Sequence, residues 1–261
     1  MLSLTEILVL AVVQGVTEFL PVSSDGHLVL LGSALGIAEG GLSLIVALHI
    51  GTLIATFAVY RKDVAEVLRD LFRGQPRMAL LVVLGSIPAG VIGVLFEDWF
   101  EQRFGEPRTA AWGLLGTAAV LFVSEFLRVR HRDQPPRWMR PFDALLIGIG
   151  QAVAILPGVS RSGCTIGAAL SLGIEPSEAA RFSFLLALVA VGGAALLKAR
   201  GLLGAEDPTA PSVGLILMGI AISGVVGYLA LRLLIAYLSR GILRWFAVYC
   251  TVVGTAYLLL A

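Results

Sequence analysis

The chain has 261 residues, of which 57% are hydrophobic and only 14% are charged, and its mean hydropathy is +0.91. Soluble domains carry about 25% charged residues, so this composition excludes an ordinary soluble domain. It indicates an all-α polytopic membrane protein. The net charge of +1, without a basic cluster that has interleaved aromatic residues, argues against a nucleic-acid partner.

The first apolar run covers residues 4–20 and stops at Pro21. A polar loop, Val22–His27, and a short apolar run, Leu28–Ile37, follow it. A helix needs about 20 apolar residues to cross a bilayer core. We therefore expect this pair of half-helices to enter the membrane, break at the loop and return as a re-entrant hairpin.

Longer apolar runs predict six transmembrane helices, and the linkers between them predict their orientation. Basic residues dominate 61–77 and 128–141, which the positive-inside rule places in the cytoplasm, whereas acidic residues mark 96–108 and 199–211 as external. The predicted helices are 42–60, 78–95, 109–127, 177–198, 212–238 and 242–260.

A second broken segment lies between the apolar runs Phe142–Leu156 and Ile166–Ile174. Its loop holds Arg161 deep in an apolar chain, where an unpaired guanidinium is very costly. Hydroxyls surround this arginine, and we expect a helix to begin near Thr165, so that the loop forms a cradle for an anion such as phosphate. The hydroxyl-bearing residues are Ser160, Ser162 and Thr165.

The two broken segments are related by an internal repeat, in which Gln14 corresponds to Gln151, Ser23 to Ser160 and Gly26 to Gly163. Each half then contains one hairpin and three full spans, and this odd number predicts that the halves are inverted. Inverted repeats whose broken helices meet near the midplane are typical of many transporters. The predicted repeats are residues 1–130 and 142–261, joined by a basic cytoplasmic linker at 131–141.

Polar outliers in the two loops are the candidate functional residues, because ionisable groups inside a membrane are functional candidates by default. Glu18, Ser23, Ser24 and His27 in the first half are expected to converge on Arg161. Other roles stay open. Glu18 could be only the ion-pair partner of Arg161, His27 could be a loop histidine that caps a helix, and one of the two serines could be the N-cap of a half-helix beginning near Leu28.

Four further polar residues have a weaker claim to a function. Gln14 shares a helix face with Glu18, and we expect it and Gln151 to hydrogen-bond across the hairpins, although Gln14 could also bind substrate. His49 lies on an apolar span and His131 in a basic loop, and neither has a partner that the pattern identifies.

The motifs resemble the undecaprenyl-diphosphate phosphatase (bacitracin-resistance) family. The resemblance runs from Glu6 to about Gly254 and is carried by Gln14-Gly-Val-Thr-Glu-Phe-Leu-Pro-Val-Ser-Ser-Asp-Gly-His27 and Pro157-Gly-Val-Ser-Arg-Ser-Gly-Cys-Thr165. Many members have Glu where this chain has Gln14, and usually Thr or Ser where it has Asp25. The resemblance implies an enzyme of the bacterial inner membrane that removes the terminal phosphate of undecaprenyl diphosphate, with its site on the outer side.

Applied to this chain, that activity makes Arg161 and the hydroxyls of Ser23, Ser160, Ser162 and Thr165 the phosphate ligands. Glu18 would help to bind a divalent cation, Mg²⁺ or Ca²⁺. We expect Ser24 to be the nucleophile and His27 the general base or acid, with attack by water as the alternative. A transporter of a polyprenyl phosphate or another anion is the competing function, and a homodimer is left open.

Overall fold

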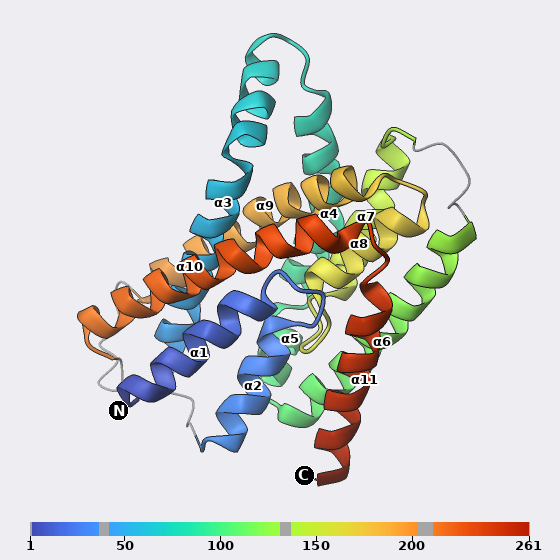
Figure 1. Ribbon diagram of the computed structural model, residues 1–261. Coiled ribbons are helices and arrows are strands. Elements are labelled where there is room, and N and C mark those ends of the chain that lie inside the picture. Colours follow the sequence, from blue (N-terminus) through green and yellow to red (C-terminus); the bar gives the residue numbers. More distant parts are fainter. Residues whose placement is uncertain (1, 37–41, 131–136, 203–210, 261) are drawn as a thin grey trace.

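The computed structural model describes residues 2–36, 42–130, 137–202 and 211–260, and the described chain is helical, without a β-sheet (Figure 1). Six helices are each long and apolar enough to cross a membrane, which confirms the six predicted spans. They are α3 (Leu42–Phe72), α4 (Arg77–Leu95), α6 (Pro107–Arg130), α9 (Pro176–Leu202), α10 (Val213–Leu238) and α11 (Leu243–Leu260).

Four short helices form the two predicted broken segments, α1 (Leu4–Thr17) with α2 (Ser24–Ala34), and α7 (Pro141–Val153) with α8 (Arg161–Ser171). They have 14, 11, 13 and 11 residues, fewer than a bilayer core requires. In Figure 1 the two pairs approach from opposite sides, and the α1–α2 loop meets the α7–α8 loop near the centre. That the pairs re-enter the membrane, and that the two halves are inverted repeats, stay predictions.

The short helices begin earlier than the sequence predicts. We expected half-helices to start near Leu28 and near Thr165, but α2 begins at Ser24 and α8 at Arg161. In both cases the preceding serine is the N-cap: the Ser23 Oγ accepts from the Gly26 N–H at 3.3 Å, and the Ser160 Oγ accepts from the Gly163 N–H at 3.1 Å. A capping hydroxyl satisfies one of the free N–H groups of a helix start, so the polar loop residues belong to the first turns.

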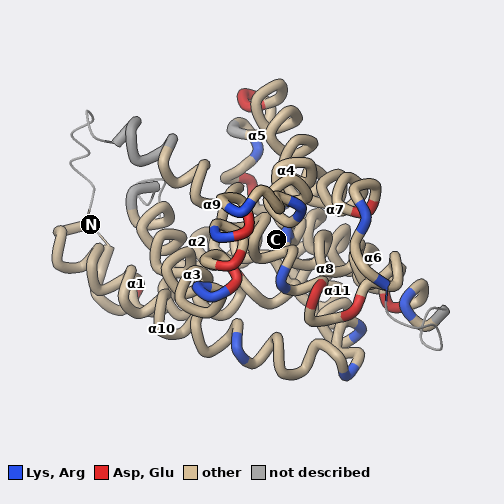
Figure 2. The backbone as a smooth tube through the Cα atoms, turned by 90° about the horizontal axis from the view of Figure 1, so that it is seen from above, with Lys and Arg blue, Asp and Glu red and all other residues tan. Residues whose placement is uncertain are grey.

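The basic segment 61–77 is not the loop that we predicted, because α3 continues through most of it to Phe72. The backbone leaves helical geometry only at Tyr60, where φ is −97° and ψ is 16°. Beyond this kink, α3 and the start of α4 project from the body of the molecule in Figure 1. Figure 2, viewed towards that tip, shows acidic and basic residues interleaved along it. The segment 96–108 likewise contains a short helix, α5 (Glu97–Phe104).

Arg137 ties the α7–α8 pair to the part of the basic linker that the structure describes. Its guanidinium donates to both carboxylate oxygens of Asp143, at 2.6 and 2.9 Å, and to the Leu172 carbonyl at 3.0 Å. The two bonds from Arg137 satisfy the buried carboxylate of Asp143. One side chain thus links the start of α7 to the end of α8. Residues 131–136 of the linker lie outside the described part.

The core forms where α3, α8 and α9 meet the α1–α2 loop, around fully buried Phe19, Phe182 and Phe184. The rings of Phe19 and Phe184 lie 5.8 Å apart, centroid to centroid, and Tyr60 stacks on Phe184 at 5.7 Å. Phe19 directly follows Glu18 in the sequence. Its burial therefore fixes the backbone that carries the Glu18 carboxylate.

The α7–α8 loop lies directly on α6, and Gly158 makes this approach possible. Its φ is +82°, and a Cβ there would lie 2.1 Å from the Ala110 carbonyl oxygen. From the other side, a Cβ at Gly113 would lie 2.0 Å from the Pro157 carbonyl oxygen. Only glycine permits both the backbone angle and the contact at position 158.

We expect Gly158→Ala to lower the stability of the protein by about 2 kcal/mol more than Gly74→Ala does, because forcing atoms into a packed contact costs about 1–3 kcal/mol. Gly74 is a matched control, since its φ is +73° and a Cβ there would meet nothing within 4 Å. Thermal unfolding of the purified proteins in detergent measures the difference. Equal losses in the two variants would show that the loop does not depend on its contact with α6.

Candidate active site

Glu18 is the centre of the site. It follows the last residue of α1 and is 9% exposed. The apolar face of α1 and the buried neighbour Phe19 carry it into the interior. A buried carboxylate is tolerated only where charges and hydrogen bonds compensate the loss of water, and the other loop and two other helices provide such partners.

Three side chains donate to this carboxylate. Arg161 Nη2 lies 2.6 Å from Glu18 Oε1. On the other oxygen, Ser24 Oγ donates to Oε2 at 2.6 Å and Gln14 Nε2 donates to it at 3.1 Å. The structure thus brings together four of the residues selected from the sequence, although Gln14 bonds within its own hairpin, not across to Gln151 as we expected.

Ser24 is aimed at Glu18 by the way in which α2 starts. Ser23 has a φ of +67° and a ψ of 104°, so the chain turns sharply before the first helical residue. The Ser23 hydroxyl caps the helix, which leaves the neighbouring hydroxyl of Ser24 free to donate to the carboxylate. A hydroxyl that donates at 2.6 Å to a carboxylate can lose its proton to that carboxylate, which is how a serine nucleophile is activated.

Arg161 is the first residue of α8, and its guanidinium is only partly engaged. Nη2 pairs with Glu18, whereas Nη1 is buried and has no hydrogen-bond partner within the described chain. An arginine has five N–H donors in a planar fork that matches phosphate oxygens. The free donors of a buried arginine beside a helix N-terminus suit an anion.

The other predicted phosphate ligands bond to protein groups. Ser160 Oγ caps α8 and lies 3.2 Å from Ser162 Oγ, and Ser162 Oγ also donates to the Leu20 carbonyl at 3.2 Å. Thr165 Oγ1 donates to the Arg161 carbonyl at 2.8 Å and lies 2.6 Å from Ser183 Oγ. These bonds connect the two loops and α9. A direct role in binding substrate stays a prediction for Ser23, Ser160, Ser162 and Thr165.

The His27 ring makes its hydrogen bonds to groups other than the Ser24 hydroxyl. Its Nδ1 lies 2.7 Å from the Ser23 carbonyl oxygen, and its Nε2 lies 2.8 Å from the hydroxyl of Tyr249 on α11. Both ring nitrogens therefore have a hydrogen-bond partner, and the ring faces α11. The predicted pairing of His27 with the Ser24 hydroxyl is absent, and the Glu18 carboxylate occupies that position.

His49 is a member of the site that the sequence analysis left out. On α3, its Nδ1 donates to the Ile45 carbonyl at 2.8 Å. Its Nε2 then faces two carboxylates, Glu18 Oε2 at 3.7 Å and Asp25 Oδ1 at 3.5 Å. An ionisable residue on an apolar span was a usable signal, but no spacing in the sequence connects residue 49 to residues 18 and 25.

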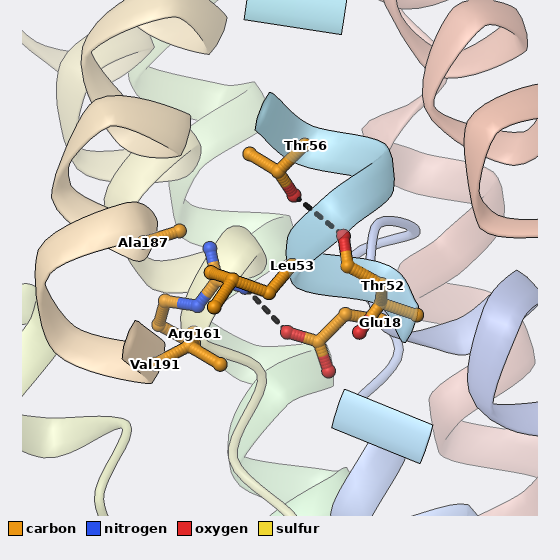
Figure 3. Close-up of a pocket in the computed structure, with 7 residues that line it drawn as sticks. All are labelled: Glu18, Thr52, Leu53, Thr56, Arg161, Ala187 and Val191. Atoms are coloured by element: carbon orange, nitrogen blue, oxygen red, sulfur yellow. Dashed lines mark hydrogen bonds and ion pairs between the residues drawn. The ribbon is translucent and has the colours of Figure 1, made fainter. Parts of the chain in front are cut away.

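A cavity of about 10 Å³ adjoins the ion pair, between α3 and α9 (Figure 3). This volume is about what one water molecule needs, so a diphosphate enters only if α3 and α9 separate. The lining residues are Glu18, Thr52, Leu53, Thr56, Arg161, Ala187 and Val191.

Within the described residues, no group of three or more His, Cys, Asp or Glu side chains could hold a metal ion. Glu18 is the carboxylate that pairs with Arg161. The site therefore fits a cation only if other oxygens, such as those of a phosphate and of water, provide most of the ligands. Mg²⁺ is commonly held in this way, by one or two carboxylates plus substrate oxygens.

The family described as bacitracin resistance protein BacA matches residues 7–256. The chain belongs to this family. The match covers both loops, five of the spans and most of α11, in close agreement with the extent predicted from the motifs.

Individual BacA-family relatives are similar over nearly their whole length. The chain is 38% identical to a protein of Halothermothrix orenii, covering 98% of this chain and 97% of that protein. It is 40% identical to one of Rubrobacter xylanophilus, covering 95% of each, and 37% identical to one of Methanosphaera stadtmanae, covering 100% and 99%. All three proteins are named undecaprenyl-diphosphatase.

We expect His49→Leu to destabilise the protein by about 1 kcal/mol, the usual net contribution of one polar interaction, since the imidazole that lies between the carboxylates of Glu18 and Asp25 is removed. His49→Gln, which retains an N–H donor, should lose less than half as much. Thermal unfolding in detergent measures both variants. A His49→Leu protein as stable as the wild type would mean that the imidazole contributes nothing to holding the two carboxylates.

Proposed function

We propose that this chain is a membrane phosphatase that hydrolyses undecaprenyl diphosphate to undecaprenyl phosphate and inorganic phosphate. One observation carries the proposal: where the two loops meet, Arg161 and Ser24 both bond the Glu18 carboxylate. Arg161 Nη2 lies 2.6 Å from Oε1, and Ser24 Oγ lies 2.6 Å from Oε2. The names of the relatives support the same substrate. Hydrolysis of this lipid renews a carrier used in cell-wall synthesis and accounts for bacitracin resistance.

Arg161 binds the diphosphate in this proposal. Phosphoryl transfer depends mainly on neutralising the phosphate charge and on holding the reacting atoms in line. The Nη1 donors have no protein partner among the described residues, so they can bond phosphate oxygens while Nη2 keeps its contact with Glu18. The N-terminus of α8, which begins at Arg161, favours the same negative charge.

Ser24 attacks the terminal phosphorus, and Glu18 accepts the hydroxyl proton. The new Oγ–P bond replaces the bond to the bridging oxygen, which leaves with its electron pair as undecaprenyl phosphate. Water then cleaves the phosphoserine to inorganic phosphate and restores the hydroxyl. We assign the base to Glu18 and not to His27, because Glu18 is the group that accepts the Ser24 hydrogen bond. Direct attack by water that Glu18 orients is the alternative.

A divalent cation, Mg²⁺ or Ca²⁺, fits beside Glu18 if the substrate supplies the remaining oxygens. When bound, it would neutralise part of the diphosphate charge. Glu18 would then contribute one carboxylate oxygen while Arg161 and Ser24 retain their positions.

The substrate reaches the site from within the bilayer. The cavity lies between two spans, and the lining side chains Leu53, Ala187 and Val191 are apolar, so the polyprenyl tail can remain in lipid while the head group passes between α3 and α9. We place the protein in the bacterial inner membrane with the site open to the outer side, as the family resemblance implies.

We expect the purified protein in detergent to release inorganic phosphate from a long-chain polyprenyl diphosphate, and to do so faster with Mg²⁺ or Ca²⁺ than with a chelator. No release from folded protein under any of these conditions would favour transport of a polyprenyl phosphate instead. The names of the three relatives give no support to that alternative.

Arg161→Gln should lower kcat at least about 1,000-fold, since an arginine that stabilises a transferring phosphoryl group contributes a factor of about 10³–10⁵. Arg103→Gln is the matched control, because the Arg103 guanidinium bonds the Trp99 carbonyl and lies over the Trp99 ring on its own helix. Phosphate release measures both, and gel filtration checks that each variant is folded. Near wild-type activity in Arg161→Gln would contradict the phosphate-binding role.

Ser24→Ala distinguishes the two modes of attack. With a serine nucleophile we expect a loss of about 1,000-fold or more and, in the wild type, a phosphorylated Ser24 peptide after rapid acid quenching, detected by mass spectrometry. Ser33→Ala, on the same helix, should behave as the wild type. Residual activity above about a tenth of the wild-type rate, with no phosphoserine, would show that water attacks directly.

A further inference from the structure

Ser23 has a backbone conformation that needs support. Its φ of +67° makes it the one residue other than glycine with a positive φ in the described chain. Such angles are disfavoured for side chains with a Cβ and persist where neighbouring contacts enforce them. The angle at Ser23 sets the direction of the next peptide and therefore where the Ser24 hydroxyl points.

His27 supplies the contacts that hold Ser23. The Ser23 carbonyl accepts from the His27 backbone N–H at 3.3 Å and from the His27 ring Nδ1 at 2.7 Å. The backbone bond belongs to the first turn of α2, whereas the bond from the ring depends on the orientation of the imidazole. The ring thus adds a second and shorter bond to the one that the backbone already makes to this carbonyl.

Tyr249 on α11 fixes that ring in two ways. The two rings are nearly parallel, with an interplanar angle of 6° and centroids 5.6 Å apart, and the hydroxyl lies 2.8 Å from Nε2. Because the Nδ1 proton is directed to the Ser23 carbonyl, the neutral ring accepts at Nε2, and the Tyr249 hydroxyl donates to it. Orientation and tautomer of His27 are set together.

The contact forms because α11 lies along the α1–α2 loop. The neighbouring residue Cys250 is fully buried, with its Sγ 3.9 Å from the Pro21 carbonyl oxygen. α11 packs chiefly on α6. Two tyrosine hydroxyls of α11 contact α2. The Tyr249 hydroxyl bonds His27, and the Tyr257 hydroxyl lies 3.4 Å from Ser33 Oγ.

We propose that Tyr249 is a positioning residue for the nucleophile. Through its bond and stacking it holds His27, which holds the strained carbonyl of Ser23, and this chain of contacts keeps the Ser24 hydroxyl directed at Glu18. The role of His27 is then to brace the loop. The inference rests on the proposed phosphatase function, because the positioned group is the nucleophile of that reaction.

The kinetic test compares Tyr249→Phe with Tyr257→Phe in the full-length protein. Both changes remove one hydroxyl from α11 that contacts α2, but only Tyr249 leads to Ser23. We expect Tyr249→Phe to lower kcat about tenfold, with KM changed less than twofold, because a misdirected serine slows the chemical step without weakening substrate binding. Tyr257→Phe should change neither constant.

Two kinetic results would overturn the proposal. The first is an unchanged kcat in Tyr249→Phe, and a rise in KM in that case would place Tyr249 on the substrate. The second is an equal loss of kcat in Tyr257→Phe, which would mean that α11 merely tethers α2. If the wild-type protein releases no phosphate, the proposed function itself has failed.

The bracing contact can be tested without any activity. Diethyl pyrocarbonate modifies unprotonated imidazole nitrogens, and mass spectrometry of the peptide that contains His27 measures the rate. With the Tyr249 hydroxyl removed, Nε2 loses its hydrogen-bond partner. We expect His27 of Tyr249→Phe to be modified at least about fivefold faster than His27 of the wild type or of Tyr257→Phe, because the lost hydrogen bond no longer protects the nitrogen. Equal rates in all three proteins would show that Tyr249 does not hold the ring.

Discussion

The ion pair between Glu18 and Arg161 is the interaction on which the rest of the site depends. It joins two loops that lie 143 residues apart in the chain. Neither charge is tolerable alone in this environment, because removing a carboxylate or a guanidinium from water costs several kcal/mol that only a close partner offsets. The two broken segments must therefore meet for either to be stable, and the reactive groups come together as a consequence.

Each loop reaches the ion pair by the same local device. A serine caps the helix that follows, and its hydroxyl accepts from the N–H of a glycine three residues later, Gly26 in one loop and Gly163 in the other. The backbones nevertheless differ, since Ser160 has a φ of −74° where Ser23 has +67°. The first loop thus carries the strain and the proposed nucleophile, whereas the second carries the arginine. This division assigns different chemical roles to equivalent positions of a repeat.

Much of this could be predicted from residue patterns. Apolar runs of sufficient length identified the six spans, and short runs interrupted by Pro21 and Pro157 identified the broken segments, because the thickness of a bilayer sets the length that a helix needs. The motifs also predicted that Glu18, Ser24 and Arg161 converge. The start of α2 was misplaced, since a polar loop and the capped first turn of a helix have the same composition. The basic segment after Tyr60 was misjudged because charge indicates the side of the membrane and not whether the chain is helical.

The sequence by itself determined the class of protein, the number of spans and most of the charged and hydroxyl groups of the site, since hydropathy and motif spacing are local properties. Only the tertiary structure decided which group each side chain serves. His49 joins Glu18 and Asp25 because α3 passes the first loop, and His27 faces Tyr249 because α11 lies beside that loop. Hydrogen bonds depend on tenths of an ångström and on ring orientation, and packing between distant helices sets both.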